Sequence, residues 1–228
     1  TIVKNLTDKY SWSKPDAMKV WAFGLEGSES NMIVDKSQSV QYLQDIRDSV
    51  QSGFRLATQQ GVLAEETLRG TKFNIIDANI HSDKAHRGAN QIVQTTRRVT
   101  LGSQLTASPR FVEPMFQLDI FCNTSCVGTI YKIISKRRGV VLSEDYGEGT
   151  SINIVAHLPV SESFGLHDQL MSLTSGKAFH QCSFSHWEII DDDPCDKNSR
   201  AFELMMNIRK RKGLKLEVPV LEDYIDKI

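Results

Sequence analysis

Residues 81–91 bring together more chemically capable side chains than any other part of the sequence. They read His-Ser-Asp-Lys-Ala-His-Arg-Gly-Ala-Asn-Gln, with two imidazoles, a carboxylate, a lysine and an arginine. Imidazole and carboxylate ligate metals, whereas cationic side chains and the unpaired N–H groups of a helix start attract anions. The spacing of His81, Asp83 and His86 matches no common zinc pattern, and no cysteine lies nearby. We therefore expect a polar or anionic partner here and no metal.

Regular elements are expected on both sides of this loop. An apolar run at 73–80 predicts a strand that ends at the loop, and Gly88 breaks the chain before a helical pattern that starts near Asn90. A loop between two such elements is held from both sides, which favours a functional site. The residues predicted to line one face of the helix are Ile92, Thr96, Val99, Gly102 and Thr106.

The chain before this loop has a mixed pattern. Short apolar runs at 19–23 and 32–34 predict a β-hairpin that turns at 24–27. Apolar residues at steps of three and four then predict a long helix from residue 40, with Ser37 or Ser39 as its N-terminal cap. These elements predict an α/β unit.

Residues 112–189 have a second, distinct pattern. Alternating apolar residues predict strands, and steps of three and four predict helices between them. The order is strand, helix, strand, strand, helix, strand, which is the ferredoxin-like βαββαβ arrangement of an α+β fold. On the last strand, His180, Cys182 and His186 fall on one face by alternation, which packing explains better than metal binding. The strands are expected at 112–122, from 140, at 152–158 and at 178–190, and the helices at 127–138 and 166–173.

The domain organisation follows from where these patterns begin and end. The first unit is expected at 1–111 and is completed by 190–228, so that 112–189 is inserted within it. The acidic stretch at 191–194 is expected to be a turn or linker, and a last helix is expected at 199–212. Both units are expected to be two-layer α/β structures.

Composition restricts the class of protein. Among 228 residues, 40% are hydrophobic and 24% are charged, which is ordinary for a globular chain. The net charge of −1 argues against a protein that coats nucleic acid through charge alone. No apolar run approaches the ~20 residues of a membrane span, and there is no secretory leader pattern. The four cysteines form no Cys-x-x-Cys pair, so free thiols in a reducing compartment are expected.

Enzyme motifs are missing from the sequence. Neither a phosphate-binding Gly-x-x-x-x-Gly-Lys-Ser/Thr loop nor Gly-x-Ser-x-Gly occurs, and no nucleophile–base pair stands out. We assign no catalytic residue. Basic clusters occur at 97–98, 136–138 and 209–212, each on a helix or at its end. Compensation of the helix dipole explains each cluster singly, whereas three clusters in one chain favour a face that contacts phosphates.

The segment at 81–91 resembles the diphthamide loop of archaeal and eukaryotic translation elongation factor 2. Ordered matches to that family run through nearly the whole chain. They are Val-Trp-Ala-Phe-Gly at 20–24, Val-Gln-Tyr-Leu-Gln-Asp-Ile-Arg-Asp-Ser-Val at 40–50, Lys-Arg-Arg-Gly at 136–139, Leu-Pro-Val-Ser-Glu-Ser-Phe-Gly at 158–165, Gly-Lys-Ala-Phe at 176–179, Phe-Ser-His-Trp at 184–187 and Arg-Lys-Arg-Lys-Gly-Leu at 209–214.

The resemblance implies a fold and a function. The unit that is split resembles domain IV, with a ribosomal-protein-S5-domain-2-like α/β fold, and 112–189 resembles the ferredoxin-like domain V. The GTPase domain, domains II and III and the opening strands of domain IV are expected outside this fragment. GTP and Mg²⁺ are accordingly expected as cofactors of the full-length parent only. Such factors are cytoplasmic and drive translocation on the ribosome, where the domain IV tip meets rRNA, tRNA and mRNA in the decoding region.

Residue roles are carried over from the same resemblance. His86 matches the histidine that diphthamide-synthesis enzymes modify and that ADP-ribosylating toxins target. His81 and Asp83 are expected to shape the loop through side-chain-to-backbone hydrogen bonds. RNA or ribosome contacts are expected from Lys84, Arg87, Gly88, Asn90 and Gln91.

This sequence departs from the family pattern just after the modified histidine. Ala89, Asn90 and Gln94 stand where the family usually has two glycines and a proline. Loss of glycine restricts positive-φ conformations, which bears on the loop geometry. Two other classes of function stay open from the sequence. One is a ribosome-assembly or spliceosomal paralogue that uses both domains as a binding scaffold, although these paralogues lack the histidine. The other is a metal-dependent hydrolase that uses His81, Asp83 and His86.

Overall fold

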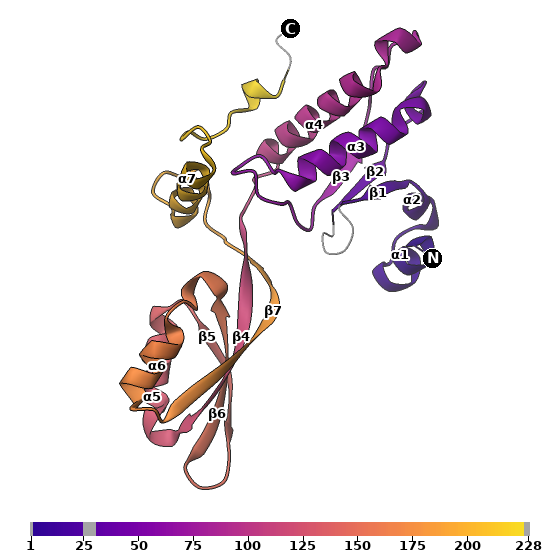
Figure 1. The fold of residues 1–228 in the computed structure, drawn as a ribbon. Helices are drawn as coiled ribbons and strands as arrows, with labels where there is room; N and C mark the ends of the chain where they lie inside the picture. Colours follow the sequence, from indigo (N-terminus) through magenta and orange to yellow (C-terminus); the bar gives the residue numbers. More distant parts are fainter. Residues whose placement is uncertain (1, 25–30, 226–228) are drawn as a thin grey trace. The chain divides into compact units, whose positions relative to one another are not determined.

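The computed structural model describes residues 2–24 and 31–225 and divides the chain into two compact units. One unit, which we call the split unit, comprises the chain up to Pro109 and from Asp192 onward. The other, the inserted unit, runs from Arg110 to Asp191, compared with the 112–189 expected from the sequence (Figure 1). Each unit has its own sheet, so the mixed α and β class is confirmed.

The split unit contains a three-stranded sheet in the order β1-β2-β3. Strand β1 (Val20–Phe23) pairs antiparallel with β2 (Met32–Asp35), which confirms the expected hairpin strands. The turn expected at 24–27 lies mostly outside the described residues. Strand β3 (Lys72–Ile75) pairs parallel with β2, so the chain must cross over between these two strands.

That crossover contains α3 (Arg47–Gln59), which packs against α4 (Ala89–Thr106). The two helices run side by side in Figure 1 and approach closely at Gly53. A Cβ at that position would lie 2.6 Å from the Val93 carbonyl oxygen and 2.7 Å from the Thr96 Cβ. The core between helices and sheet includes Trp21, Ile33, Leu43, Ile46, Val50 and Phe54.

Helices α1 (Ile2–Tyr10), α2 (Lys14–Met18) and α7 (Arg200–Lys212) complete the regular structure of the split unit that we describe, together with short 3-10 turns. The helix expected at 199–212 is confirmed as α7. Its cap is the Ser199 hydroxyl, which accepts a hydrogen bond from the Phe202 N–H at 3.0 Å.

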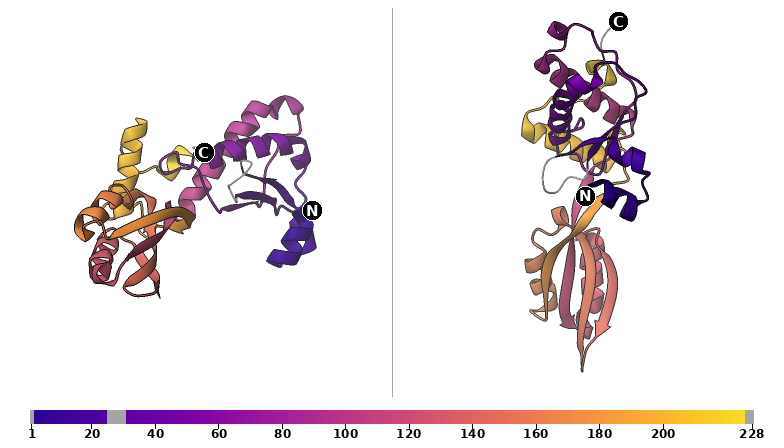
Figure 2. Two further views of the ribbon diagram at one scale, coloured as in Figure 1. Left: turned by 60° about the horizontal axis from the view of Figure 1, so that its bottom comes forward. Right: turned by 90° about the vertical axis from the view of Figure 1, so that its right-hand side faces the viewer.

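The inserted unit confirms the expected order of strands and helices. Its four strands form one antiparallel sheet in the order β5-β6-β4-β7, and both helices cover one face of it (Figure 2). Alternate residues of β4 and β6, such as Leu118, Ile120 and Ile154, are fully buried against the helices. The elements are β4 (Val112–Asn123), α5 (Val127–Lys136), β5 (Val140–Tyr146), β6 (Ser151–Pro159), α6 (Leu166–Thr174) and β7 (Ala178–Ile189).

Two expected element boundaries in the split unit were wrong. The strand expected at 73–80 ends at Ile75, because the following Asp77-Ala78-Asn79 stretch favours turns: the Asp77 carboxylate accepts from the next N–H. The helix expected from residue 40 begins at Arg47, after a 3-10 turn at Leu43–Ile46. The proposed cap Ser37 instead donates its hydroxyl to Asp35 at 2.6 Å.

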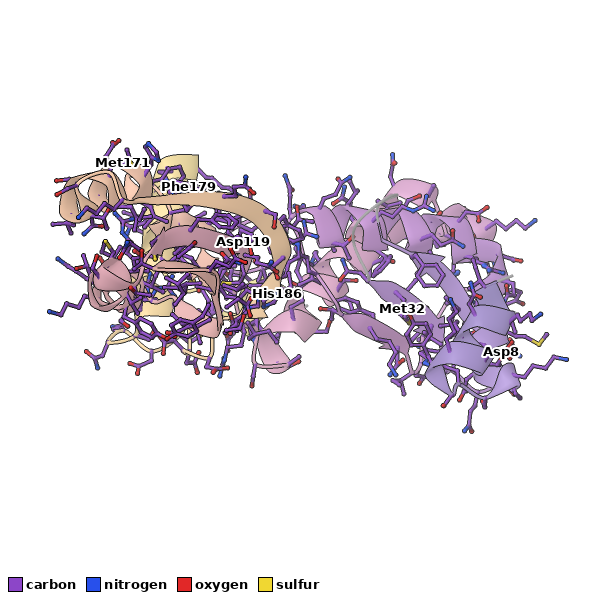
Figure 3. All side chains as sticks on the ribbon, turned by 90° about the horizontal axis from the view of Figure 1, so that it is seen from below. Asp8, Met32, Asp119, Met171, Phe179 and His186 are labelled. Carbon is purple, nitrogen blue, oxygen red and sulfur yellow. The ribbon has the colours of Figure 1, made fainter. Side chains whose placement is uncertain are left out.

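Two expected faces were wrong in part. On α4 the buried residues are Thr100, Leu101, Gly102 and Gln104, so Gly102 of the expected face is buried, whereas Val99 of that face is 62% exposed. On β7, His186 does not share a face with His180 and Cys182. The pairing with β4 shifts by one residue between Met115 and Phe116, and this irregularity reverses the alternation beyond it. Figure 3 labels His186 among the side chains.

Candidate functional site

The loop of interest connects β3 to α4 and is longer than the sequence predicted. Residues 76–83 have no helix or strand, and a 3-10 turn at Lys84–His86 precedes the start of α4 at Ala89. Two apolar residues of the expected strand, Ala78 and Ile80, pack against the core of the split unit. Packing of these side chains therefore anchors the loop without strand pairing.

His81 and Asp83 bond to the loop backbone. The His81 Nδ1 atom accepts from the Asp83 N–H at 3.0 Å, and the Asp83 Oδ1 atom accepts from the Ala85 N–H at 3.0 Å. The second bond caps the 3-10 turn that carries His86. Both bonds are of the side-chain-to-backbone type expected of loop-shaping residues.

The His86 imidazole is exposed beside that of His81. The ring centroids lie 4.5 Å apart with a tilt of 58°. Lys84, Asn90 and Gln91 are exposed as well, so this part of the loop presents imidazole, amine and amide groups to solvent. In the part of the chain that the structure describes, no group of three or more His, Cys, Asp or Glu residues is arranged to hold a metal.

The Arg87 side chain, expected to contact RNA, is turned inward instead. It is only 6% exposed. Its Nη1 donates to the Asp45 carboxylate at 2.7 Å, and its Nη2 donates to the Ser82 carbonyl at 3.2 Å. The guanidinium carbon lies 4.5 Å from the centroid of the Tyr42 ring, a cation–π distance. Because these groups already neutralise and cover the guanidinium, the expected phosphate contact of Arg87 is revised to internal support of the loop.

The departures from the family pattern are compatible with this geometry. Ala89 and Asn90 are the first two residues of α4, where an ordinary helical backbone is required. Gly88, the N-terminal cap, has φ −58°, and no residue of 81–91 has positive φ. The loop as it stands therefore does not need the two missing glycines.

Most of the basic clusters also make internal bonds. Arg138 forms a two-pronged pair with Glu113, with both N–O distances 2.8 Å, and this carboxylate raises the pKa of the arginine further. Arg137 donates to the carbonyls of Glu162 and Phe164. The face expected to contact phosphates is therefore not formed by these two residues, because the inserted unit uses them to hold a loop.

The cluster at 209–212 behaves in the same way. Arg209 is buried and donates to the Leu63 and Lys215 carbonyls, both at 2.6 Å. Lys212 donates to the Ala64 and Glu65 carbonyls at 3.0 and 2.7 Å. These bonds tie α7 to the loop after α3, so two of the four cationic residues serve the fold of the split unit.

Sequence reasoning missed two residues of the site, Tyr42 and Asp45. Both contact Arg87, which lies 42 residues further along the chain than Asp45. No local pattern reports a contact across that separation. The nearest sequence signal was the family match at 40–50, which includes both residues.

Comparison with known families covers residues 1–108 and 110–198. Residues 1–108 match the family model described as elongation factor G, domain IV, and residues 110–198 match the model described as elongation factor G C-terminus. The class of protein is therefore a translation elongation factor. The chain belongs to the elongation factor G family, of which it contains domain IV and the C-terminal domain. Membership implies protein biosynthesis on the ribosome. No described helix is long and apolar enough to cross a membrane.

Proposed function

We propose that this chain is the C-terminal part of an elongation factor 2 of the eukaryotic and archaeal type. In this proposal, the loop at 81–91 enters the decoding region of the ribosome during translocation of tRNA and mRNA. The observation that carries it is the exposed His86 in the motif His-Arg-Gly-Ala-Asn-Gln, on a loop within a unit that matches domain IV. GTP hydrolysis, with its Mg²⁺, belongs to the full-length parent.

His86 is the proposed site of diphthamide. Extension of its imidazole by a cationic arm would reach RNA groups that the bare ring cannot reach. The exposed position of His86 also suits access by diphthamide-synthesis enzymes and by ADP-ribosylating toxins. These enzymes, like the ribosome, would be met in the cytoplasm.

The proposed contact surface surrounds His86 on the exposed side of the loop. Lys84 supplies positive charge, and Asn90 and Gln91 supply amide groups that hydrogen-bond to RNA. Gly88 and the first turn of α4 add unpaired backbone N–H groups with a partial positive charge. His81 and Asp83 hold this surface in shape, and Arg87 supports it from within.

Mass spectrometry of the peptide that contains His86 tests the proposal. The protein is made in a eukaryotic host, because a bacterial host is not expected to have the pathway. We expect a mass increase on His86 that is absent from the His86→Gln variant. An unmodified His86 in that host would remove the modification from the proposal.

Co-sedimentation tests the ribosome contact separately. We expect the chain to sediment with assembled eukaryotic ribosomes and the Lys84→Ala variant to do so several-fold less. Lys197→Ala, an exposed lysine of the same unit outside the loop, is the matched control. Binding to a pre-ribosomal or spliceosomal particle in place of ribosomes would instead favour the scaffold function of a paralogue.

A further inference from the structure

We propose that Tyr42 and Asp45 are positioning residues for His86, and that they act through Arg87. The three residues form what we call the tip clamp: the Arg87 guanidinium is held between the Asp45 carboxylate, the Tyr42 ring and the Ser82 carbonyl. The clamp joins the segment before α3 to the loop before α4. For its biological meaning the inference rests on the proposed function, but its structural part does not.

The clamp fixes both ends of the loop segment that carries His86. Arg87 directly follows His86, so its backbone position sets where the imidazole begins. The bond from Nη2 to the Ser82 carbonyl ties the start of the segment to its end at 3.2 Å. Within this closed segment, the Asp83 cap orders the turn at Lys84–His86. The imidazole is then left exposed on a backbone that is held from inside.

Burial makes the clamp sensitive to loss of Asp45. The Arg87 side chain is 6% exposed, and its Nε atom is buried with no hydrogen-bond partner among the residues that the structure describes. A guanidinium in this position depends on the partners it has, because an unpaired buried charge is strongly unfavourable. Loss of the Asp45 carboxylate leaves the guanidinium with only the Ser82 carbonyl and the Tyr42 ring of the clamp, and we expect the loop backbone to open more often.

Tyr42 provides an independent observation. Its backbone has φ 60° and ψ 7°, a left-handed conformation that residues other than glycine and asparagine rarely adopt. It stands directly before the 3-10 turn at Leu43–Ile46 that carries Asp45. Such strain is retained where surrounding structure enforces it, often at functional sites. Here it places the Tyr42 ring over the guanidinium.

Hydrogen exchange of the purified chain, followed by mass spectrometry, tests the clamp. We expect Asp45→Asn and Tyr42→Leu to accelerate exchange in peptides covering 81–88 by about tenfold, equivalent to about 1.4 kcal/mol of local opening. Two controls should leave exchange unchanged. Tyr42→Phe keeps the ring, and Asp48→Asn removes an exposed carboxylate from the first turn of α3.

Unchanged exchange at 81–88 in both test variants would overturn the clamp. Equal acceleration throughout α3 and α4 would also overturn it, because the contacts would then hold the whole unit and not the loop. Arg87→Lys keeps the charge but lacks the separate donors that bond Asp45 and the Ser82 carbonyl, so it should accelerate exchange at 81–88 with Asp45 still present.

The modified fraction of His86 in a eukaryotic host then separates this inference from the proposed function. We expect Asp45→Asn to lower the modified fraction several-fold. If His86 of the wild-type chain is unmodified but hydrogen exchange at 81–88 is faster in Asp45→Asn, the proposed function is overturned and the clamp stands. Full modification of both chains with unchanged exchange would overturn the clamp and leave the proposed function standing.

Discussion

At Gly139 the chain passes so close to neighbouring residues that there is no room for a side chain. This residue follows α5 and precedes β5, and a Cβ there would lie 2.5 Å from the Ile134 Cγ2 atom and 3.0 Å from the His157 carbonyl oxygen. We expect Gly139→Ala to destabilise the inserted unit by about 1–3 kcal/mol through overpacking. Chemical denaturation measures this change.

Gly128 offers the matched control for that substitution. It lies in α5, and a Cβ there would meet nothing within 4 Å. Because alanine restricts the unfolded chain and favours helix, Gly128→Ala should leave stability equal or raise it by up to about 1 kcal/mol. A similar loss in both variants would show that the contacts around Gly139 are not the cause.

The buried Arg209 allows a second test, of whether a charged side chain stabilises the fold of the split unit. Its replacement by leucine leaves the Leu63 and Lys215 carbonyls without their donor. We expect Arg209→Leu to destabilise the split unit by about 2–4 kcal/mol, measured by thermal or chemical denaturation. Arg211→Leu, an exposed neighbour on α7, should change stability by less than about 0.5 kcal/mol. Equal changes in stability in the two variants would show that the bonds of Arg209 do not stabilise the fold more than an exposed arginine does.

At the level of elements, the contact between α6 and β7 predicts a dependence on pH. Burial, and secondarily the nearby His167, lower the pKa of His180 from its ordinary value of 6.5. The two rings lie 5.7 Å apart. As the pH falls below 6.5, the unfolded chain takes up a proton at this residue before the folded chain does. The free energy of unfolding therefore falls as the pH decreases from 6.5 toward the lower pKa of His180 in the folded chain, and this residue causes no further loss below that pKa.

Thermal unfolding of the inserted unit between about pH 7 and about pH 5.5 checks this dependence. We expect the melting temperature to fall on acidification and His180→Gln to reduce that fall. His186→Gln, an exposed histidine of the same strand, is the control. An identical pH dependence in wild type and His180→Gln would contradict the prediction.

The elements of the inserted unit were predictable because each repeats a local pattern. Leu118, Ile120 and Cys122 alternate along β4, and all three are buried. The exception, His186, lies beyond a register shift, and alternation carries no information about where a strand shifts against its neighbour. In the split unit, the apolar residue Ile80 packs in the core without strand pairing, so apolar character alone extended the expected strand too far.

The candidate site was predictable in position but only partly in chemistry. Family resemblance singled out His86, whose modification stays a prediction, and the short-range bonds of His81 and Asp83 follow from residue type and spacing. Asp45 lies 42 residues from Arg87 in the sequence, and Leu63 lies 146 residues from Arg209. An exposed and a buried arginine look alike in sequence, so the choice between phosphate contact and internal support required the structure.

At the level of the whole molecule, the inserted unit should fold by itself. Its two ends are paired with each other: Val112 stands opposite Ile189, and the Ile190 N–H donates to the Phe111 carbonyl at 2.8 Å. Its core is drawn from its own strands and helices. We expect residues 110–191, made alone, to unfold in one cooperative thermal transition near that of the same unit in the full chain. A non-cooperative melt would contradict this.

The internal use of arginine has a consequence for how the chain would meet RNA. Arg87, the arginine of the loop at 81–91, is already bonded to the Asp45 carboxylate, so it displaces few counterions from a nucleic acid. Each phosphate that a protein neutralises adds about −0.7 to −0.9 to the slope of log affinity against log salt concentration. Contact through this loop should therefore have a shallow salt dependence, with discrimination by shape and hydrogen bonding outweighing long-range charge attraction.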